Sequence, residues 1–236
     1  MHVAPALVES YGAAVAGTLM DDARASLARL AVRVPWARGP RGAVFNRFLG
    51  ITAQELAAYE AFRALGEPPE VAWSWCHRTL LVRLARVPAW RRRALRWLIG
   101  STVVRRIVAR RARSGAEHRV GGFAVRYWAG GEGFAFGVDY VRCANLDFVI
   151  GQGAAAFAPF VCLSDLVLSD AFGWGLTRTQ TLADGCDRCD FRFRPGGPTR
   201  IHSSLPQVQT AIEASRAASA ALALSAGTRG RRARGR

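Results

Sequence analysis

The sequence contains no lysine. All 33 basic residues are arginine, against 17 acidic residues, so the net charge is +16 and the pI is near 11.4. A cationic surplus of this size usually indicates a nucleic-acid partner or an anionic membrane surface. However, the absence of lysine beside abundant alanine and glycine is typical of GC-rich coding bias, and no recognised nucleic-acid-binding motif accompanies the charge. We therefore predict no specific nucleic-acid partner.

Histidine is scarce, and the common catalytic motifs are missing. The four histidines are scattered along the chain, which has no G-x-S-x-G motif, no phosphate-binding loop and no H-E-x-x-H zinc motif. The pair Cys186-x-x-Cys189 could supply half of a zinc site, but a closed structural site needs four ligands. It could also form a redox pair, but such pairs sit at a helix N-terminus, whereas we place this one in a hairpin. We expect no metal and no cofactor.

A signal peptide is not indicated, because the N-terminus lacks a basic start and Glu9 interrupts any apolar run. The most apolar window, residues 148–168, contains Gln152, Pro159 and Asp165. We therefore predict a core segment there and no membrane span. The odd number of cysteines, five, favours reduced thiols. We expect a cytoplasmic protein, and the sequence specifies no oligomeric state.

The chain divides by hydrophobic period into three parts. Residues 1–113 show helical spacing and are predicted to be a helical lead-in that packs on the core. Within them, Thr52-Ala-Gln-Glu55 resembles a capping box that opens a helix. Residues 114–198 are expected to form an α+β domain that carries the candidate site. Residues 199–236 are predicted to be an alanine-rich helix followed from Gly227 by a disordered arginine-rich tail.

Residues 90–113 combine nine arginines with an apolar stripe, broken at Gly100. We favour a solvated arginine face over a buried apolar stripe, because arginine stems cover apolar surface while their charged ends stay in water. The alternative is a basic amphipathic helix lying on an anionic membrane.

Two hairpins are predicted in the α+β part. Residues 122–128 and 133–142 flank a glycine turn, and residues 174–182 pair with residues 188–194 across a second turn. Residues 145–168 between the hairpins are helical in composition, in two pieces because of Pro159. The fold class is therefore α+β: a helical N-terminal half packed on a small antiparallel sheet built from two hairpins with intervening helices.

Thiols, carboxylates and one arginine are concentrated in the last third of the chain. Asp165 lies three residues after Cys162 and would share its helix face. Arg178 is the nearest counter-charge and could form a two-pronged contact with a substrate carboxylate. The other candidates are Cys143, Cys189, Thr179, Thr181 and Asp190. Each cysteine could equally be a small core residue.

The order of these residues resembles the L-2-amino-thiazoline-4-carboxylic acid hydrolase family. The resemblance is carried, between residues 134 and 193, by Cys143, Cys162-x-x-Asp165, Arg178-Thr-x-Thr-Leu-Ala-x-Gly185 and Cys189-Asp-Phe191. It implies a hydrolase of cysteine metabolism, which opens a cyclic isothiourea or related cyclic amidine to a carbamoyl-cysteine-type product. A small-molecule substrate is thus the expected partner.

The resemblance and the sequence together suggest roles for these residues. We expect Cys162, Asp165, Cys143 and Cys189 to be catalytic, and Arg178, Thr179, Thr181 and Asp190 to bind substrate. Strand alternation, however, places Arg178 and Thr181 on opposite faces. The alternative function is a non-catalytic small-molecule-binding domain that keeps the pocket.

Overall fold

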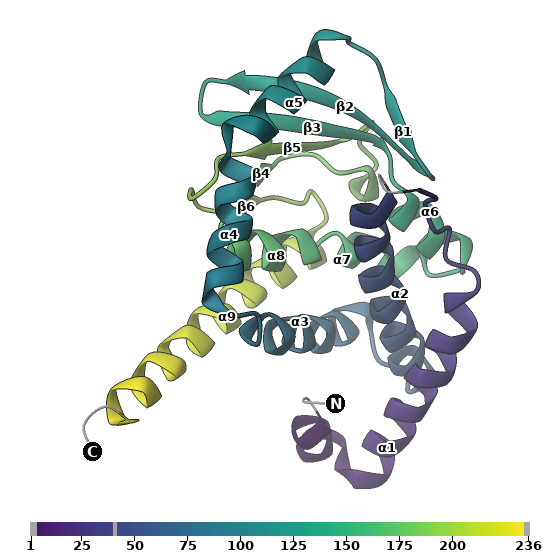
Figure 1. Cartoon of the computed structure of the whole chain (residues 1–236). Helices are drawn as coiled ribbons and strands as arrows, with labels where there is room; N and C mark the ends of the chain where they lie inside the picture. The colour runs from purple at the N-terminus through teal and green to yellow at the C-terminus, as the bar shows by residue number, and fades with distance from the viewer. Residues whose placement is uncertain (1–3, 40–41, 234–236) are drawn as a thin grey trace.

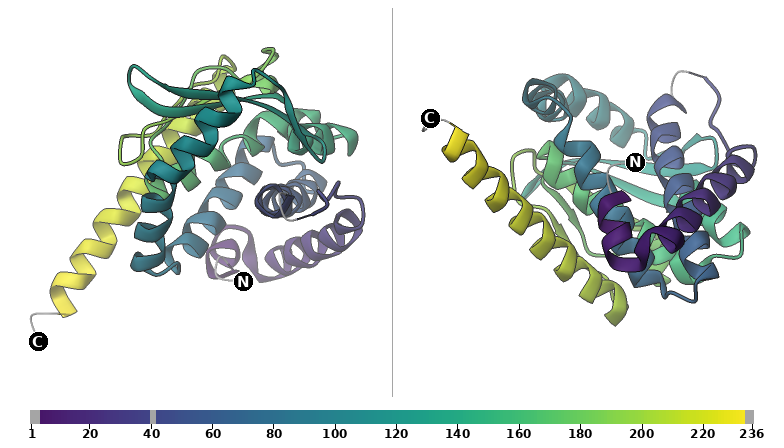
Figure 2. Two further views of the ribbon diagram at one scale, coloured as in Figure 1. Left: turned by 45° about the horizontal axis from the view of Figure 1, so that its top comes forward. Right: turned by 90° about the horizontal axis from the view of Figure 1, so that it is seen from below.

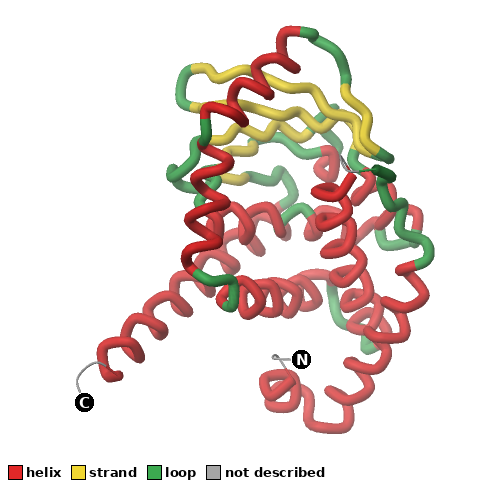
Figure 3. Tube along the Cα trace, in the orientation of Figure 1, coloured by secondary structure: helices red, strands yellow, loops and turns green. Residues whose placement is uncertain are grey.

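The computed structural model describes residues 4–39 and 42–233, and the chain within them is mainly helical (Figures 1 and 3). Five helices precede the sheet: α1 Ala4–Ala31, α2 Gly42–Ala64, α3 Pro69–Ala85, α4 Ala89–Gly100 and α5 Thr102–Arg113. The later helical segments are α6 Ala144–Gly151, η1 Ala155–Phe157, α7 Ala158–Val161, α8 Ser164–Phe172, η2 Leu182–Asp184 and α9 Pro206–Ala233. Pro159 lies in the first turn of α7, where its missing N–H costs no helical hydrogen bond.

The strands form one six-stranded sheet in the order β1-β2-β3-β5-β4-β6. Its members are β1 His118–Val120, β2 Phe123–Gly131, β3 Phe134–Arg142, β4 Leu176–Arg178, β5 Cys189–Phe193 and β6 Arg200–Ile201. All neighbours are antiparallel except β4 and β6. The predicted α+β class is confirmed. The predicted pairs β2–β3 and β4–β5 are both present, whereas the short edge strands β1 and β6 were not predicted.

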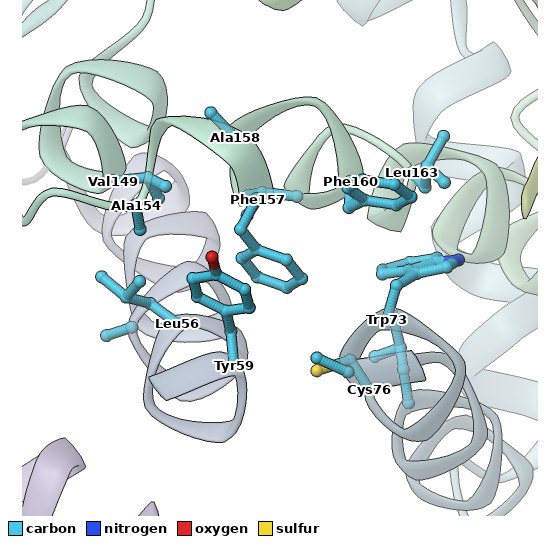
Figure 4. Close-up of a cluster of buried hydrophobic side chains, with 14 of the residues drawn as sticks. Leu56, Tyr59, Trp73, Cys76, Val149, Ala154, Phe157, Ala158, Phe160 and Leu163 are labelled. Carbon is cyan, nitrogen blue, oxygen red and sulfur yellow. The ribbon is translucent and has the colours of Figure 1, made fainter. Parts of the chain in front are cut away.

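Helices α6, α7 and α8 lie between the sheet and helices α2 and α3 (Figures 1 and 2). Aromatic side chains of α7 and of the preceding turn η1 form the centre of the core, where Tyr59 of α2 stacks on Phe157 of η1 with 4.5 Å between ring centroids. Trp73 of α3 is 2% exposed and donates its indole N–H to Ser215 of α9 at 3.1 Å. Figure 4 shows these rings converging from the two helical layers. The helical N-terminal half therefore supports the segment that carries Cys162 and Asp165.

Two local predictions are wrong. The pattern Thr52-x-x-Glu55 does not open a helix, since it lies in the interior of α2, and both residues are buried there. The arginine-rich segment is divided at Ser101, and α4 buries none of its side chains. Its apolar stripe is therefore not covered by the protein as expected.

The C-terminal helix α9 continues to Ala233 and so passes Gly227, where the sequence predicts a disordered tail to begin. The last three residues of that predicted tail lie outside the described residues. Among the described residues, one stretch, Ala155–Phe172, is long and apolar enough to cross a membrane. It is divided into η1, α7 and α8, and 56% of it is buried within the fold.

Candidate functional site

Arg178 stands at the centre of the candidate site. It ends β4, its side chain is 1% exposed, and its Nη1 donates to Asp165 Oδ2 at 2.7 Å and to the carbonyl oxygen of Cys162 at 3.0 Å. The guanidinium also lies 5.7 Å from the centre of the Phe191 ring of β5. One buried cation thus ties together β4, β5, the end of α7 and the start of α8. Such a charge is tolerated in the interior only when it is paired.

Asp165, in the first turn of α8, supplies the negative partner. Its side chain is 23% exposed, so one side of the ion pair reaches the surface. Burial raises the pKa of its carboxyl group from 3.8 to about 6, although the charge and hydrogen bond of Arg178 act in the opposite direction. The carboxylate is therefore mainly ionised at neutral pH, yet its pKa is close enough to neutrality for proton transfer.

Thr181 lies between two thiols. Its hydroxyl group donates to Cys162 Sγ at 3.8 Å and accepts from Cys189 Sγ at 3.5 Å and from the backbone N–H of Ala183 at 3.2 Å. The N–H of Leu182 donates to Cys189 Sγ at 3.3 Å. The short turn η2, which Thr181 caps, therefore holds Thr181 and Cys189 in place.

The thiols are held in their neutral form. Burial raises the pKa of Cys162 well above its usual value, and the charge of Arg178 offsets this only in part. Burial likewise raises the pKa of Cys143 to about 12. The pKa of Cys189 is also raised by burial, against the hydrogen bonds of Thr181 and Leu182. A reactive thiolate would therefore require a base during the reaction.

Six of the predicted residues come together, and two do not. Cys143, at the N-terminus of α6, interacts electrostatically with Cys189 and Asp165. We call the six residues that come together the thiol cluster: Cys143, Cys162, Asp165, Arg178, Thr181 and Cys189. Thr179 and Asp190 instead bind each other. Asp190 accepts from the N–H and the hydroxyl of Thr179 at 2.8 and 2.6 Å, at an exposed position.

The predicted conflict between Arg178 and Thr181 is resolved by the length of β4. The strand ends at Arg178, so its alternation of faces does not extend to Thr181. The intervening residues turn, which leaves Thr179 exposed and both Arg178 and Thr181 buried.

Glu55 and Ser164 were missed by the sequence reasoning. Glu55 of α2 is 5% exposed, and its Oε1 accepts a hydrogen bond from the hydroxyl of Ser164, the residue before Asp165. Burial raises the pKa of Glu55 to about 8, and the charge of Asp165 adds to the effect. Its Oε2 is buried with no hydrogen-bond partner among the described residues. Glu55 also lines a cavity of about 450 Å³ between α1, α2 and α3.

A second polar cluster, also missed, lies around Asp139 of β3. Asp139 is buried and accepts from Arg192 at 2.7 Å and from the indole N–H of Trp128 at 2.8 Å. Arg192 alternates along β5 with Cys189 and Phe191, so this cluster lies on the opposite face of the sheet from the thiols. An aspartate in the middle of an apolar strand was the only sequence signal for it.

Metal ligands do not gather in the part of the chain that the structure describes, where no group of three or more His, Cys, Asp or Glu side chains could hold an ion. Cys186 lies in the turn after η2, and its backbone N–H donates to the carbonyl of Thr181.

Residues 102–193 match the model of the L-2-amino-thiazoline-4-carboxylic acid hydrolase family. The resemblance seen in the motifs is thereby confirmed, and the match to the thiazoline-carboxylate hydrolases extends further toward the N-terminus than those motifs, to the start of α5. It includes every residue of the thiol cluster but leaves out Glu55. No curated protein and no solved structure matches the chain.

Proposed function

We propose that this protein hydrolyses a small cyclic isothiourea, for which L-2-amino-thiazoline-4-carboxylate is the first substrate to test. The family match supports hydrolase chemistry over residues 102–193. The observation that carries the proposal is the ion pair of Asp165 with the buried Arg178, which also holds the backbone carbonyl of Cys162.

In the proposed reaction, Cys162 is the nucleophile and Asp165 is its base. The thiol proton passes to Asp165 as sulfur attacks the substrate carbon that lies between nitrogen and sulfur. The tetrahedral adduct then breaks its bond to the ring sulfur, which leaves as a thiolate and takes up the proton. Water attacks the resulting enzyme-bound isothiouronium, and its oxygen bonds to the carbon as the bond from that carbon to Cys162 breaks. One water proton passes through Asp165 to the sulfur of Cys162, and the other is released to solvent, which gives a carbamoyl-cysteine-type product and the free enzyme.

Arg178 has a different role in this proposal from the substrate clamp suggested by the sequence. Its side chain is 1% exposed and is already bonded to Asp165. We therefore assign it as the counter-charge of the reacting groups. When the proton moves from Cys162 to Asp165, one anion replaces another beside the same guanidinium, so the net charge of the buried group does not change. This avoids the large cost of burying an additional charge.

The decisive experiment measures the release of new thiol from the substrate by the purified protein in catalytic amount. Cys162→Ser is expected to abolish release, and Asp165→Asn to reduce the rate at least about a hundredfold, as expected for loss of a general base. Cys186→Ser is the matched control and should retain the wild-type rate, because Cys186 lies in the turn outside the cluster. Near-normal rates for the serine variants of Cys143, Cys162 and Cys189 would instead favour Asp165 acting on water.

A non-catalytic binding domain is the second candidate, and one observation favours it: burial keeps the thiols of Cys143, Cys162 and Cys189 protonated in the free protein. It predicts saturable binding of the isothiourea, measured by calorimetry, without thiol release. It also predicts that Asp165→Asn changes the affinity for the isothiourea and that neither the variant nor the wild type releases thiol.

A further inference from the structure

The helix α4 buries none of its side chains, and its largest aromatic side chains point to the outside. A Cβ atom placed on Gly173, just after α8, would lie 2.7 Å from Arg96 Cδ, so this arginine packs against the end of α8. By contrast, Trp90 and Trp97 are 64% and 74% exposed. Seven residues are close to two helical turns, so the two indole rings share one face. A surface helix usually buries its apolar stripe, whereas α4 leaves both tryptophans exposed.

Exposed apolar side chains are also present on α5, the next helix of the chain. Ser101 separates the two helices and caps α5 by accepting from the N–H of Val104. On α5, Val108 is buried, while Val103 and Ile107, one turn apart, are exposed. Figure 1 shows α5 continuing from the end of α4 and lying over strands β2 and β3. We call the exposed apolar side chains of both helices the α4–α5 strip: Trp90, Leu95, Trp97, Leu98, Val103 and Ile107.

The strip is embedded in uncompensated positive charge. Residues 71–116 contain no aspartate or glutamate. In the described part of the chain, no ion pair joins an arginine of α4 or α5 to a carboxylate. The arginines of the two helices are Arg91, Arg92, Arg93, Arg96, Arg105, Arg106, Arg110, Arg111 and Arg113.

We propose that the α4–α5 strip docks the protein on the surface of an anionic lipid bilayer. Indole rings favour the boundary between headgroups and hydrocarbon, and branched aliphatic side chains gain free energy by entering the hydrocarbon. Arginines beside them bind the anionic headgroups. Tryptophan and arginine would also suit single-stranded RNA, but Leu98, Val103 and Ile107 have no role in base stacking or phosphate binding. The aliphatic part of the strip therefore favours the membrane.

The test is co-sedimentation of the full chain with large vesicles of phosphatidylcholine alone or with about 30% phosphatidylglycerol. We expect binding to the anionic vesicles, weaker binding in 0.5 M salt because surface charges are screened, and little binding to neutral vesicles. Trp90→Ala/Trp97→Ala should weaken the affinity more than about tenfold. Arg91→Gln/Arg93→Gln should weaken it roughly 25-fold, from about fivefold for each charge.

The connector between α1 and α2 offers matched controls on the other side of the molecule from α4 (Figure 1). Trp36 there is 48% exposed, and Arg33 and Arg38 are exposed. Trp36→Ala and Arg33→Gln/Arg38→Gln remove the same groups and should leave vesicle binding unchanged. Circular dichroism is expected to be the same for all variants, because the changed side chains are exposed.

Three results would overturn the proposal. The first is no binding to anionic vesicles at low salt. The second is equal loss of binding in the connector and α4 variants, which would indicate a response to net charge alone. The third is binding of a 20-nucleotide RNA that depends on Trp90 and Trp97 while vesicle binding does not, which would assign the strip to nucleic acid.

Discussion

Replacing Glu55 by glutamine should make the protein more stable at neutral and alkaline pH. Glu55 is 5% exposed, and one of its oxygens has no hydrogen-bond partner among the described residues. Burial raises its pKa from 4.5 to about 8. Glutamine has nearly the shape of the protonated acid and retains an oxygen that can accept from Ser164, but it cannot ionise. The variant therefore removes only the cost of the charge.

The size and sign of the effect follow from proton linkage. Between pH 4.5 and pH 8 the folded state holds a proton that the unfolded chain has released, so stability falls as pH rises through this window. Each unit of pKa difference corresponds to about 1.4 kcal/mol. At pH 7 the wild-type protein should have lost on the order of 3 kcal/mol at this residue. Glu55→Gln should lose none of it, so the difference in unfolding free energy between the two proteins should widen from pH 5 to pH 8.

Urea unfolding followed by tryptophan fluorescence at half-unit steps from pH 5 to pH 8.5 measures this difference. Glu9→Gln, at an exposed position of α1, is the matched control and should run parallel to the wild type throughout. If the curves of Glu55→Gln and the wild type are parallel over the same range, Glu55 does not titrate as a buried acid, and the reasoning is refuted.

Three further changes probe the structure around the site. Asp165→Ala should lower the free energy of unfolding, measured in urea, by about 3 kcal/mol, because it leaves a buried guanidinium unpaired. The double variant with Arg178→Met should lose about 2 kcal/mol less than the sum of the two single variants. Additive losses would contradict the pairing. Thr181→Val should lower the free energy of unfolding by about 1 kcal/mol, because η2 loses its cap. It should also slow thiol release, because valine has no hydroxyl group to bond the thiols. Unchanged stability and an unchanged rate would contradict this. Gly175→Ala should lower the unfolding free energy by more than about 2 kcal/mol, because φ is +60° and the new Cβ would lie 1.9 Å from the carbonyl oxygen of Arg194; a wild-type melting curve would show that this turn can relax.

Local signals in the sequence were enough for much of the fold. The glycine turns and alternating side chains predicted the β2–β3 hairpin, because the geometry of a hairpin is set by neighbouring residues. Pro159 predicted the break in the central helical segment for the same reason. The α+β class followed from helices and hairpins occupying different parts of the chain.

Contacts between distant segments were not accessible in the same way. Glu55 and Ser164 are 109 residues apart and meet only in the folded chain, where the first residue of α8 reaches a side chain of α2. The capping-box pattern at Glu55 was a local signal overridden by that packing. In α4 the apolar stripe among the arginines indicated a helix with two faces, but spacing alone does not show which face the rest of the protein covers. The end of β4 at Arg178 likewise depends on the turn that follows. The predicted strand, with its alternation of faces, was therefore extended too far, to residue 182.

The location of Arg178 also explains how one site can contain both a base and neutral thiols. Without a cation, burial would raise the pKa of Asp165 still further, so less of the carboxyl group would be ionised and able to act as a base. With the same cation, the thiol of Cys162 remains protonated because burial outweighs the attraction. In the resting state the proton is therefore on the sulfur of Cys162. A thiolate forms only when Asp165 accepts that proton. The rate of thiol release should accordingly rise with pH through the pKa of Asp165, near 6.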